Sequence, residues 1–431
     1  MTHSYRFTKL AAASVIGALA LTSCGGDAGG EEGGGGDGGE VNLRFSWWGS
    51  DARHQATEAA IDVFNETHEG ITVEGEYGEW GGYWDQLATQ TAGNNAPDII
   101  QMDDKYLREY ADRGSLLELS DVDTSEFDEG AVDNGRTEDG LFGITTGINS
   151  LALVTNPDVI AEAGLEMPDD TSWTWEDFAE MTAAISESGD GVYGTNNPNE
   201  PGSFQVWLRQ QGTNFTTEEG GLGFDEAQAT EYFQYHLDLV NNGMASPSEL
   251  SENQGAGPDQ SMMGTGTAAM ASWWTNQLGG LSDASGADLE LLRFPTESGD
   301  PMESGMWYKS SMLMSASAGT DHPEEVKTFI DWFVNSEEAA DFNGFDRGLP
   351  ANASIRDYVL EDAGEADQKT ADFILDIESE VEAQSVEPVP ALGFSALQEI
   401  LYRYESEVFF ENMTPEEAAE SMIPEMESAL G

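Results

Sequence analysis

Three consecutive stretches decide the fold class: VNLRFSWW (41–48), DARHQATEAAIDVFNETHE (51–69) and ITVEGEY (71–77). The first and the third are rich in β-branched and aromatic residues, which is typical of short strands. The middle stretch repeats apolar residues at helical spacing, at Ala56, Ala59, Ala60, Val63 and Phe64. A strand, a helix and a strand in this order predict a βαβ unit.

The same alternation continues along the rest of the chain. Strand patterns are found at 96–104, 150–156, 289–295 and 310–316, and helical patterns at 83–93, 106–113, 174–188, 227–243, 323–342 and in a short helix that Thr414 caps. Gly114 is expected to stop the second of these helices. Alternation on this scale predicts an α/β chain with parallel sheets and helices on both faces.

Length and charge narrow the function classes. The 431 residues exceed one ordinary core and suggest two domains. With 16 Lys and Arg against 82 Asp and Glu, the formal net charge is -66. Such a field repels phosphate backbones, so no nucleic acid partner is expected and a phosphorylated ligand is disfavoured. Dense surface carboxylates also suit a saline habitat.

The N-terminus has the pattern of a secretory signal peptide. Arg6 and Lys9 precede the apolar run LAAASVIGALALTS (10–23), which is shorter than a membrane-spanning helix. The run ends at the chain's single cysteine in LTSC (21–24), which resembles the lipobox of bacterial lipoproteins. This resemblance implies a signal peptide over 1–23 and lipidation of Cys24; the alternative is a free thiol near the cleavage site. Residues 24–40, rich in glycine and acids, predict a flexible tether.

A set of further motifs resembles the extracellular solute-binding proteins of ABC-type sugar importers, the family 1 class that includes maltose-binding protein. The motifs are GNNAPDIIQMDDKYLREYADRGSLLELSD (93–121), GITTGINSLALVTNPDVIAEAGL (143–165), TWEDFAE (174–180), GTGTAAMASWW (264–274), HPEEVKTFIDWFVNSEEAA (322–340) and RGLPAN (347–352). No single one is decisive, but their order and spacing cover nearly the whole chain after the tether.

The resemblance implies a two-lobe periplasmic-binding-protein-like fold of the α/β class, with discontinuous lobes, a hinge of crossing strands and an interlobe cleft. Crossings are expected near 146–153, 294–305 and 351–358, which would give lobe 1 as 41–148 with 305–352 and lobe 2 as 149–304 with 353–431. It further implies a lipid-anchored monomer on the outer face of the cell membrane. Such a protein delivers a sugar to the transmembrane subunits of a permease, without enzymatic activity, cofactor or metal.

Adjacent tryptophans indicate how a sugar would be held. A pyranose ring has C–H groups on its face and hydroxyls around its edge, so it suits a flat indole with polar groups at the rim. In open α/β sheets ligands bind beyond the carboxyl ends of strands. The candidate ligand-binding residues, each close to the end of a strand or to an expected crossing, are Trp47, Trp48, Trp80, Tyr83, Asp103, Asn149, Trp273, Trp274, Asn276, Trp307 and Arg347.

Two of these expectations come from the family resemblance. It implies that Asp103 bonds sugar hydroxyls, with Asp104 as the less favoured substitute, and that Trp273, Trp274 and Asn276 form an aromatic platform. Trp80 and Tyr83 are expected in the loop after the second strand. Because neighbouring strand residues face opposite ways, one indole of each pair is expected in the core. Arg347 is favoured as a structural residue at the hinge.

Other chemistries fit the sequence less well. Glu126 replaces the glycine that a calcium loop beginning at Asp121 would need, and the five histidines lack metal-ligand spacing. Nucleotide-binding P-loops and G-x-S-x-G nucleophile motifs are absent from the sequence. A secreted glycoside hydrolase stays open as an alternative because acids are abundant. A tethered lectin that is not coupled to transport is the other alternative. The sugar is expected to be neutral, and polyols are also compatible.

Overall fold

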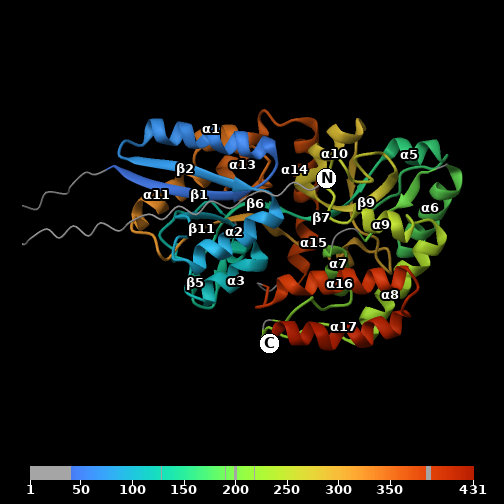
Figure 1. The fold of residues 1–431 in the computed structure, drawn as a ribbon. Helices are drawn as coiled ribbons and strands as arrows, with labels where there is room; N and C mark the ends of the chain where they lie inside the picture. The colour runs from blue at the N-terminus through green and yellow to red at the C-terminus, as the bar shows by residue number, and fades with distance from the viewer. Residues whose placement is uncertain (1–39, 128, 190, 199–200, 218, 385–389) are drawn as a thin grey trace, which may run out of the picture. The chain divides into compact units, whose positions relative to one another are not determined.

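Two β-sheets organise the part of the chain that this computed structural model describes, residues 40–431 except 128, 190, 199–200, 218 and 385–389 (Figure 1). The larger sheet has the order β12 (Leu349–Pro350), β6 (Ile144–Asn149), β11 (Lys309–Ala316), β3 (Ile99–Met102), β1 (Val41–Trp48), β2 (Ile71–Gly78). The smaller has the order β10 (Glu290–Leu292), β7 (Leu151–Thr155), β9 (Ala268–Trp274), β8 (Tyr193–Thr195). A short hairpin pairs β4 (Arg136–Thr137) with β5 (Gly140–Leu141).

The chain passes between the two sheets several times. Ser150 alone separates β6 of the larger sheet from β7 of the smaller one. The chain returns between β10 and β11, and it leaves the larger sheet again after β12. Both sheets are therefore assembled from segments that are distant in sequence. The exact lobe boundaries stay a prediction.

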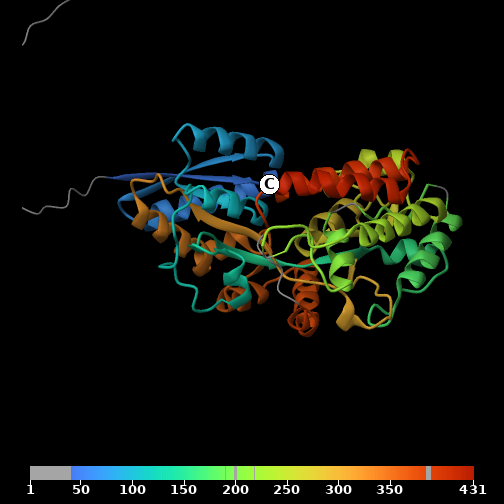
Figure 2. The same ribbon diagram turned by 90° about the horizontal axis from the view of Figure 1, so that it is seen from below.

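Helices cover both faces of each sheet (Figure 1). They are α1 (Asp51–Thr67), α2 (Trp80–Ala92), α3 (Asp104–Asp112), α4 (Glu129–Asp133), α5 (Pro157–Glu162), α6 (Trp175–Ser188), α7 (Gly202–Gln210), α8 (Glu226–Asn242), α9 (Pro247–Asn253), α10 (Leu278–Ser285), α11 (Pro323–Asn335), α12 (Glu337–Asn343), α13 (Ala353–Leu360), α14 (Glu365–Asp376), α15 (Glu378–Ala383), α16 (Phe394–Phe409) and α17 (Pro415–Leu430), with short 3-10 turns at Thr275–Gln277 and Pro301–Glu303. The C-terminal helix α17 runs beside α16 and α8 (Figure 2), and their apolar faces form one core cluster.

Strand alternation on β1 separates the first tryptophan pair. Trp47 points to the face covered by α1 and α11, where it joins Phe45 in the core. Trp48 points to the face covered by α2 and α3. Across the parallel β1–β2 pair, a Cβ atom on Gly75 would lie 2.6 Å from the Trp47 ring, so only glycine fits beside this indole. The missing side chain at Gly75 therefore leaves the space in which the Trp47 ring packs as a core residue.

The expectation of parallel sheets is only partly right. The β1–β2, β1–β3 and β8–β9 pairs are parallel, whereas β11, β6, β12, β7 and β10 form antiparallel pairs. The reason is the crossing chain path. The chain reaches β11 directly from the other sheet and not through a helix that follows a neighbouring strand. β11 is therefore not the second strand of a right-handed βαβ unit, which would have made it parallel.

Helix boundaries bring three smaller corrections. Trp80 and Tyr83 belong to α2 and not to a loop, because α2 begins at Trp80, two residues after β2 ends at Gly78. The helix expected over 323–342 is two helices, because the Ser336 side chain accepts a hydrogen bond from the Ala339 amide and starts α12. The helix capped by Thr414 and Glu417 extends to Leu430, longer than expected.

A buried arginine cluster links the smaller sheet to the helices that follow it. Arg293, directly after β10, contacts Asp170 at 3.3 Å, Asp376 at 2.6 Å and Glu380 at 2.7 Å. The side chains of Arg293 and Glu380 are 7% and 5% exposed. Little water reaches either group, so each charge is stabilised mainly by its ion-pair partners. The cluster connects β10 to α14, α15 and the loop before α6.

We expect Arg293→Met to destabilise the protein by about 3–5 kcal/mol, because it leaves a buried carboxylate without its partner. Denaturant unfolding measures the free energy. The matched control is Arg403→Met, which removes an exposed ion pair with Glu425 (52% and 42% exposed) and should cost about 0–1 kcal/mol. Equal costs for the two variants would contradict the role given to Arg293.

Candidate functional site

A cavity lies where elements of the two sheets face each other. It contains about 410 Å³ of empty space, counting its open mouth. The larger sheet's side supplies residues of α3 and β11, and the smaller sheet's side supplies the end of β9, α7 and α16. The lining residues are Asp104, Lys105, Pro201, Gly202, Gln205, Phe215, Trp274, Trp307, Lys309, Pro390, Phe394 and Gln398. We call this cavity the cleft.

Two indoles form the aromatic wall of the cleft. Trp274 ends β9 and is partly exposed, and its ring meets the Trp307 ring edge to face, with centroids 5.9 Å apart and planes at 88°. The Trp307 ring lies 5.7 Å from the Arg209 guanidinium, and its buried indole N–H has no hydrogen-bond partner among the described residues. Trp307 is 4% exposed and belongs to a core cluster, so only a small part of its ring borders the cleft.

A charged wall faces the indoles. The Lys309 ammonium lies 3.4 Å from Asp103, 3.1 Å from Asp104 and 5.1 Å from the centroid of the Trp274 ring. Asp103 also caps α3, since its side chain accepts a hydrogen bond from the Lys105 amide. This one lysine therefore holds the two acids and an indole in fixed positions around the cleft.

The two aspartates differ in protonation. Burial acts to raise the pKa of Asp103, but the charges of Lys309 and Lys105 outweigh it and lower that pKa. Burial raises the pKa of Asp104 to about 8 against the effect of Lys309, and the Asp103 carboxylate adds to the rise. At neutral pH the pair holds one proton and one negative charge, which the lysine balances.

Three of the predicted ligand residues lie in the core. Trp47 is fully buried and its indole N–H donates to His54 Nδ1 at 3.1 Å. Tyr83 is buried, and its hydroxyl donates to the carbonyls of Ser46 and Gln101. Trp273 belongs to the core cluster between β9 and α10. None of the three lines the cleft, because strand or helix periodicity turns them to the packed side.

Trp48 and Trp80 belong to an aromatic cluster next to the cleft. Their ring centroids lie 5.0 Å apart at 81°, and both contact Trp84. Trp80 is 40% exposed, and the ammonium of the cleft residue Lys105 lies 5.6 Å from its ring centroid. Trp80 is thus an exposed indole that lies beside Lys105 of the cleft wall but does not line the cleft itself.

The remaining predicted residues lie at the crossing between the sheets. The Asn149 amide donates to the Asn276 side chain at 3.0 Å, which joins the end of β6 to the turn after β9. Arg347 is 3% exposed and donates to Gln101, Asn343 and Thr57. Burial, with the charge of Arg53, lowers the pKa of Arg347 to about 9. Arg347 thus bonds side chains of the larger sheet and its helices, and not hinge carbonyls, and it does not line the cleft.

Several cleft residues escaped the sequence prediction. Lys309 directly follows Trp307 and Tyr308 and is one of only 16 Lys and Arg residues in the chain. This combination could have identified it as a cleft residue from the sequence. Asp104 was ranked below Asp103, but it is Asp104 that lines the cavity. Gln205, Phe215, Phe394 and Gln398 gave no local signal, because only the fold brings their elements to this cavity.

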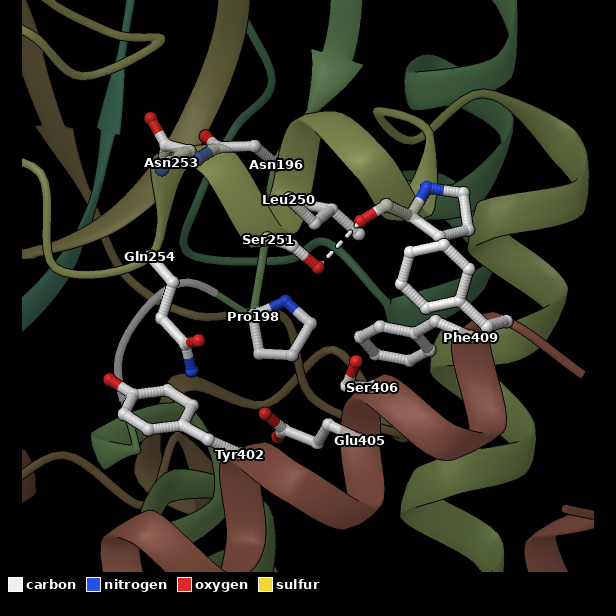
Figure 3. A pocket seen from close by; sticks show the side chains of 12 residues that line it. Asn196, Pro198, Leu250, Ser251, Asn253, Gln254, Tyr402, Glu405, Ser406 and Phe409 are labelled. Atoms are coloured by element: carbon white, nitrogen blue, oxygen red, sulfur yellow. Dashed lines mark hydrogen bonds between the residues drawn. The ribbon is translucent and has the colours of Figure 1, made fainter. Parts of the chain in front are cut away.

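A second recess lies within the smaller sheet's side of the molecule, between α9 and α16 (Figure 3). It contains about 430 Å³ of empty space, again including its opening. Tyr402, Glu405, Ser406 and Phe409 line it from α16. Unlike those of the cleft, the described lining residues of this recess include none from the larger sheet or its helices.

Two negative findings concern the described residues. Their histidines, aspartates and glutamates form no group of three or more that could hold a metal ion. Within the same ranges, each helix is either too short or too polar to cross a membrane. Residues 1–23, Cys24 and the tether up to residue 39 lie outside the described residues.

The Asp104 proton predicts a pH dependence of stability. Because the folded pKa lies above the unfolded one, this group stabilises the fold fully below about pH 3.8, and the contribution is lost as pH rises toward about 8. Asp104→Asn stays neutral at every pH, so its stability relative to the parent protein should rise between pH 4 and about 8. Denaturant unfolding at several pH values tests this. The exposed Asp85→Asn serves as control, and the same pH trend in both variants would contradict the assignment.

Known proteins were compared with this sequence and fold. The profile of a family described as bacterial extracellular solute-binding protein matches residues 59–371. A lipoprotein of Streptomyces antibioticus, named only by its place in the oleD 5' region, is 28% identical over 163 residues, which are 36% of this chain and 36% of that protein. The arabinooligosaccharide-binding protein of Halalkalibacterium halodurans is 24% identical over 267 residues, 59% of this chain and 57% of that relative.

The fold has solved counterparts. A periplasmic oligogalacturonide-binding protein from Yersinia enterocolitica, in complex with saturated digalacturonic acid, superposes with a TM-score of 0.79 at 23% identity, over 91% of this chain and all of that one (100%). At this identity the match establishes the two-lobe α/β fold. Together with the profile match over most of the chain, it shows that the chain belongs to the bacterial extracellular solute-binding proteins.

Proposed function

We propose that this protein captures a neutral sugar or oligosaccharide in the cleft and delivers it to the permease of an ABC importer. The observation that carries the proposal is the edge-to-face pair of Trp274 and Trp307 opposite Lys309 and Asp104. The indoles offer apolar faces for sugar C–H groups, and the opposite wall offers donors and acceptors for hydroxyls. The name of the Halalkalibacterium relative, arabinooligosaccharide-binding protein, supports a carbohydrate ligand.

We propose a neutral ligand because of the strong negative charge of the chain; the cleft itself holds two lysines, Lys105 and Lys309, beside the aspartate pair. Lys309 already has two acid partners, and one proton remains on the aspartate pair at neutral pH. Sugar hydroxyls can accept from the ammonium and donate to the carboxylate without adding a charge. A phosphorylated ligand would add at least one negative charge to a chain of net charge -66.

The proposed mechanism is a shift between open and closed lobes. A ligand that contacts Trp274 on one side and Asp104 on the other binds best when the two sides are close, so it favours the closed form by its difference in affinity. The crossing at Ser150, where Asn149 bonds Asn276, is the proposed hinge. The permease would recognise the closed form.

A hydrolytic role has weaker support. Glycoside hydrolases place two carboxyl groups on either side of the scissile bond. Among the described lining residues the only acid is Asp104, and its neighbour Asp103 lies on the same wall, paired with the same lysine. We therefore propose binding without turnover. A tethered lectin uses the same cleft and differs only in lacking a permease.

Trp274→Ala should weaken sugar binding at least about tenfold, which is about 1.4 kcal/mol, and leave the fold intact. The test is a thermal-shift and calorimetry panel of mono- to oligosaccharides, polyols, amino acids and peptides. Tyr77→Ala is the matched control, because Tyr77 is an exposed aromatic residue (48%) on β2 that does not line the cleft. Unchanged affinity in Trp274→Ala, or stabilisation by amino acids alone, would refute the sugar platform.

The protein is further proposed to be a monomer anchored to the outer face of the membrane through a lipid on Cys24. The LTSC sequence and the lipoprotein name of the Streptomyces relative support this. Cys24→Ala should move the protein from the membrane fraction to the soluble extracellular fraction, since one acylated residue provides the anchor. Membrane retention of Cys24→Ala would contradict the anchor without affecting the binding proposal.

A further inference from the structure

We infer that the recess between α9 and α16 is an outer part of the sugar site, which holds the distal units of an oligosaccharide whose first units occupy the cleft. This inference rests on the proposed function and goes beyond it by assigning a second binding region and a preference for longer chains. The residues that line the recess are Asn196, Pro198, Pro247, Leu250, Ser251, Asn253, Gln254, Tyr402, Glu405, Ser406, Phe409 and Phe410.

One face of α16 connects the two cavities. Phe394 and Gln398 line the cleft, while Tyr402, Ser406 and Phe409 line the recess. These positions follow one another at helical spacing, so they form a single stripe along the helix. At 1.5 Å per residue the stripe from Phe394 to Phe409 is about 22 Å long, enough for several sugar rings in a row.

A second segment also borders both cavities. Pro198 lines the recess, and Pro201 and Gly202 line the cleft a few residues later. Gln398 and Tyr402 are one helical turn apart on the opposite side. The two cavities are therefore bordered by residues one helical turn apart on α16, and the proposed path of a chain leaving the cleft runs from Gln398 to Tyr402.

The lining of the recess has the composition that suits a sugar. Tyr402, Phe409 and Phe410 provide aromatic rings, while the amides of Asn253 and Gln254 and the Ser406 hydroxyl provide polar groups. Figure 3 shows Gln254, Tyr402, Pro198 and Glu405 around the same space. Aromatic faces combined with amides are the same chemistry that the cleft presents.

Asn196 adds an independent observation. Its side chain is fully buried, and neither its amide oxygen nor its amide nitrogen has a hydrogen-bond partner among the described residues. Buried amides are nearly always hydrogen-bonded, so this unpaired amide, which is enclosed by protein atoms, is unusual in the wall behind the recess.

The recess is also electrically neutral, which fits a neutral saccharide. Among the described lining residues Glu405 is the only acid, and the Tyr232 hydroxyl donates to its carboxyl at 3.0 Å. Burial raises the pKa of Glu405 to about 8, so the group is protonated at neutral pH. No lysine or arginine lines the recess among the described residues. In a chain with 82 acids, this uncharged wall is unusual.

The experiment fills the recess and measures how affinity depends on chain length. Ser406→Trp places an indole in the recess, and Ala396→Trp places one on an exposed position of the same helix that lines neither cavity. Calorimetry follows malto- and arabino-oligosaccharide ladders from one ring to about six rings, because each further bound ring acts as a tethered ligand of high effective concentration.

We expect affinity for the parent protein to rise about tenfold or more from two rings to five, as further rings reach the recess. Ser406→Trp should remove this gain and leave the affinity for one or two rings within about twofold, whereas Ala396→Trp should keep the gain. A gain that survives in Ser406→Trp, or no gain in the parent protein, would overturn the outer site. Absence of binding at every length in the parent protein would instead refute the sugar function, and the outer site with it.

Discussion

Successive side chains of a strand point to opposite faces, and this alternation governs the two tryptophan pairs of the molecule. On β1 it sends Trp47 into the core under α1 and Trp48 to the aromatic cluster near α2. On β9 it sends Trp273 into the core beside α10 and leaves Trp274 at the cleft. Each pair therefore joins a packed indole, which fixes the strand, to a second indole nearer the ligand region. Of the two outer indoles, Trp274 is partly exposed, whereas Trp48 is 7% exposed and belongs to the core cluster near α2.

The crossing of the chain between the sheets imposes a second constraint. With only Ser150 between β6 and β7, the strand that ends one sheet continues almost directly into the other. The Asn149–Asn276 hydrogen bond lies at this point, so rotation of one sheet against the other would act on it first. The acids and the lysine of the cleft belong to α3 and β11 of the larger sheet, while the indoles belong to the smaller sheet's side. The cleft thus depends on both sides at once, as ligand-driven closure requires.

Local sequence patterns predicted most of the helices and strands. They did not predict which of these elements lie next to each other in the fold. The strand over Val41–Trp48, the helix capped by Thr174 and the αL stop at Gly114 follow from periodicity and capping chemistry. Parallel pairing did not follow, since β11 returns from another sheet and no local signal shows that. Of the predicted ligand residues, Trp274 and Trp307 line the cavity, and their role in binding stays a prediction. Phe394 and Gln398 were not found, because their contact with residues far away in sequence is a property of the fold alone.

The described lysines divide between the surface and the cleft. Of the described lysines, Lys327 and Lys369 pair with surface acids, whereas Lys105 and Lys309 lie at the cleft. Each of the latter two lies over an indole, Trp80 or Trp274, so a donor stands beside an aromatic face. Lys309 is balanced by Asp103 and its partly protonated neighbour, and the strong negative charge of the surface is therefore not continued into the cleft. A ligand that enters this site meets the partly exposed Trp274 ring and the hydrogen-bonding groups of Lys105, Lys309 and the aspartate pair.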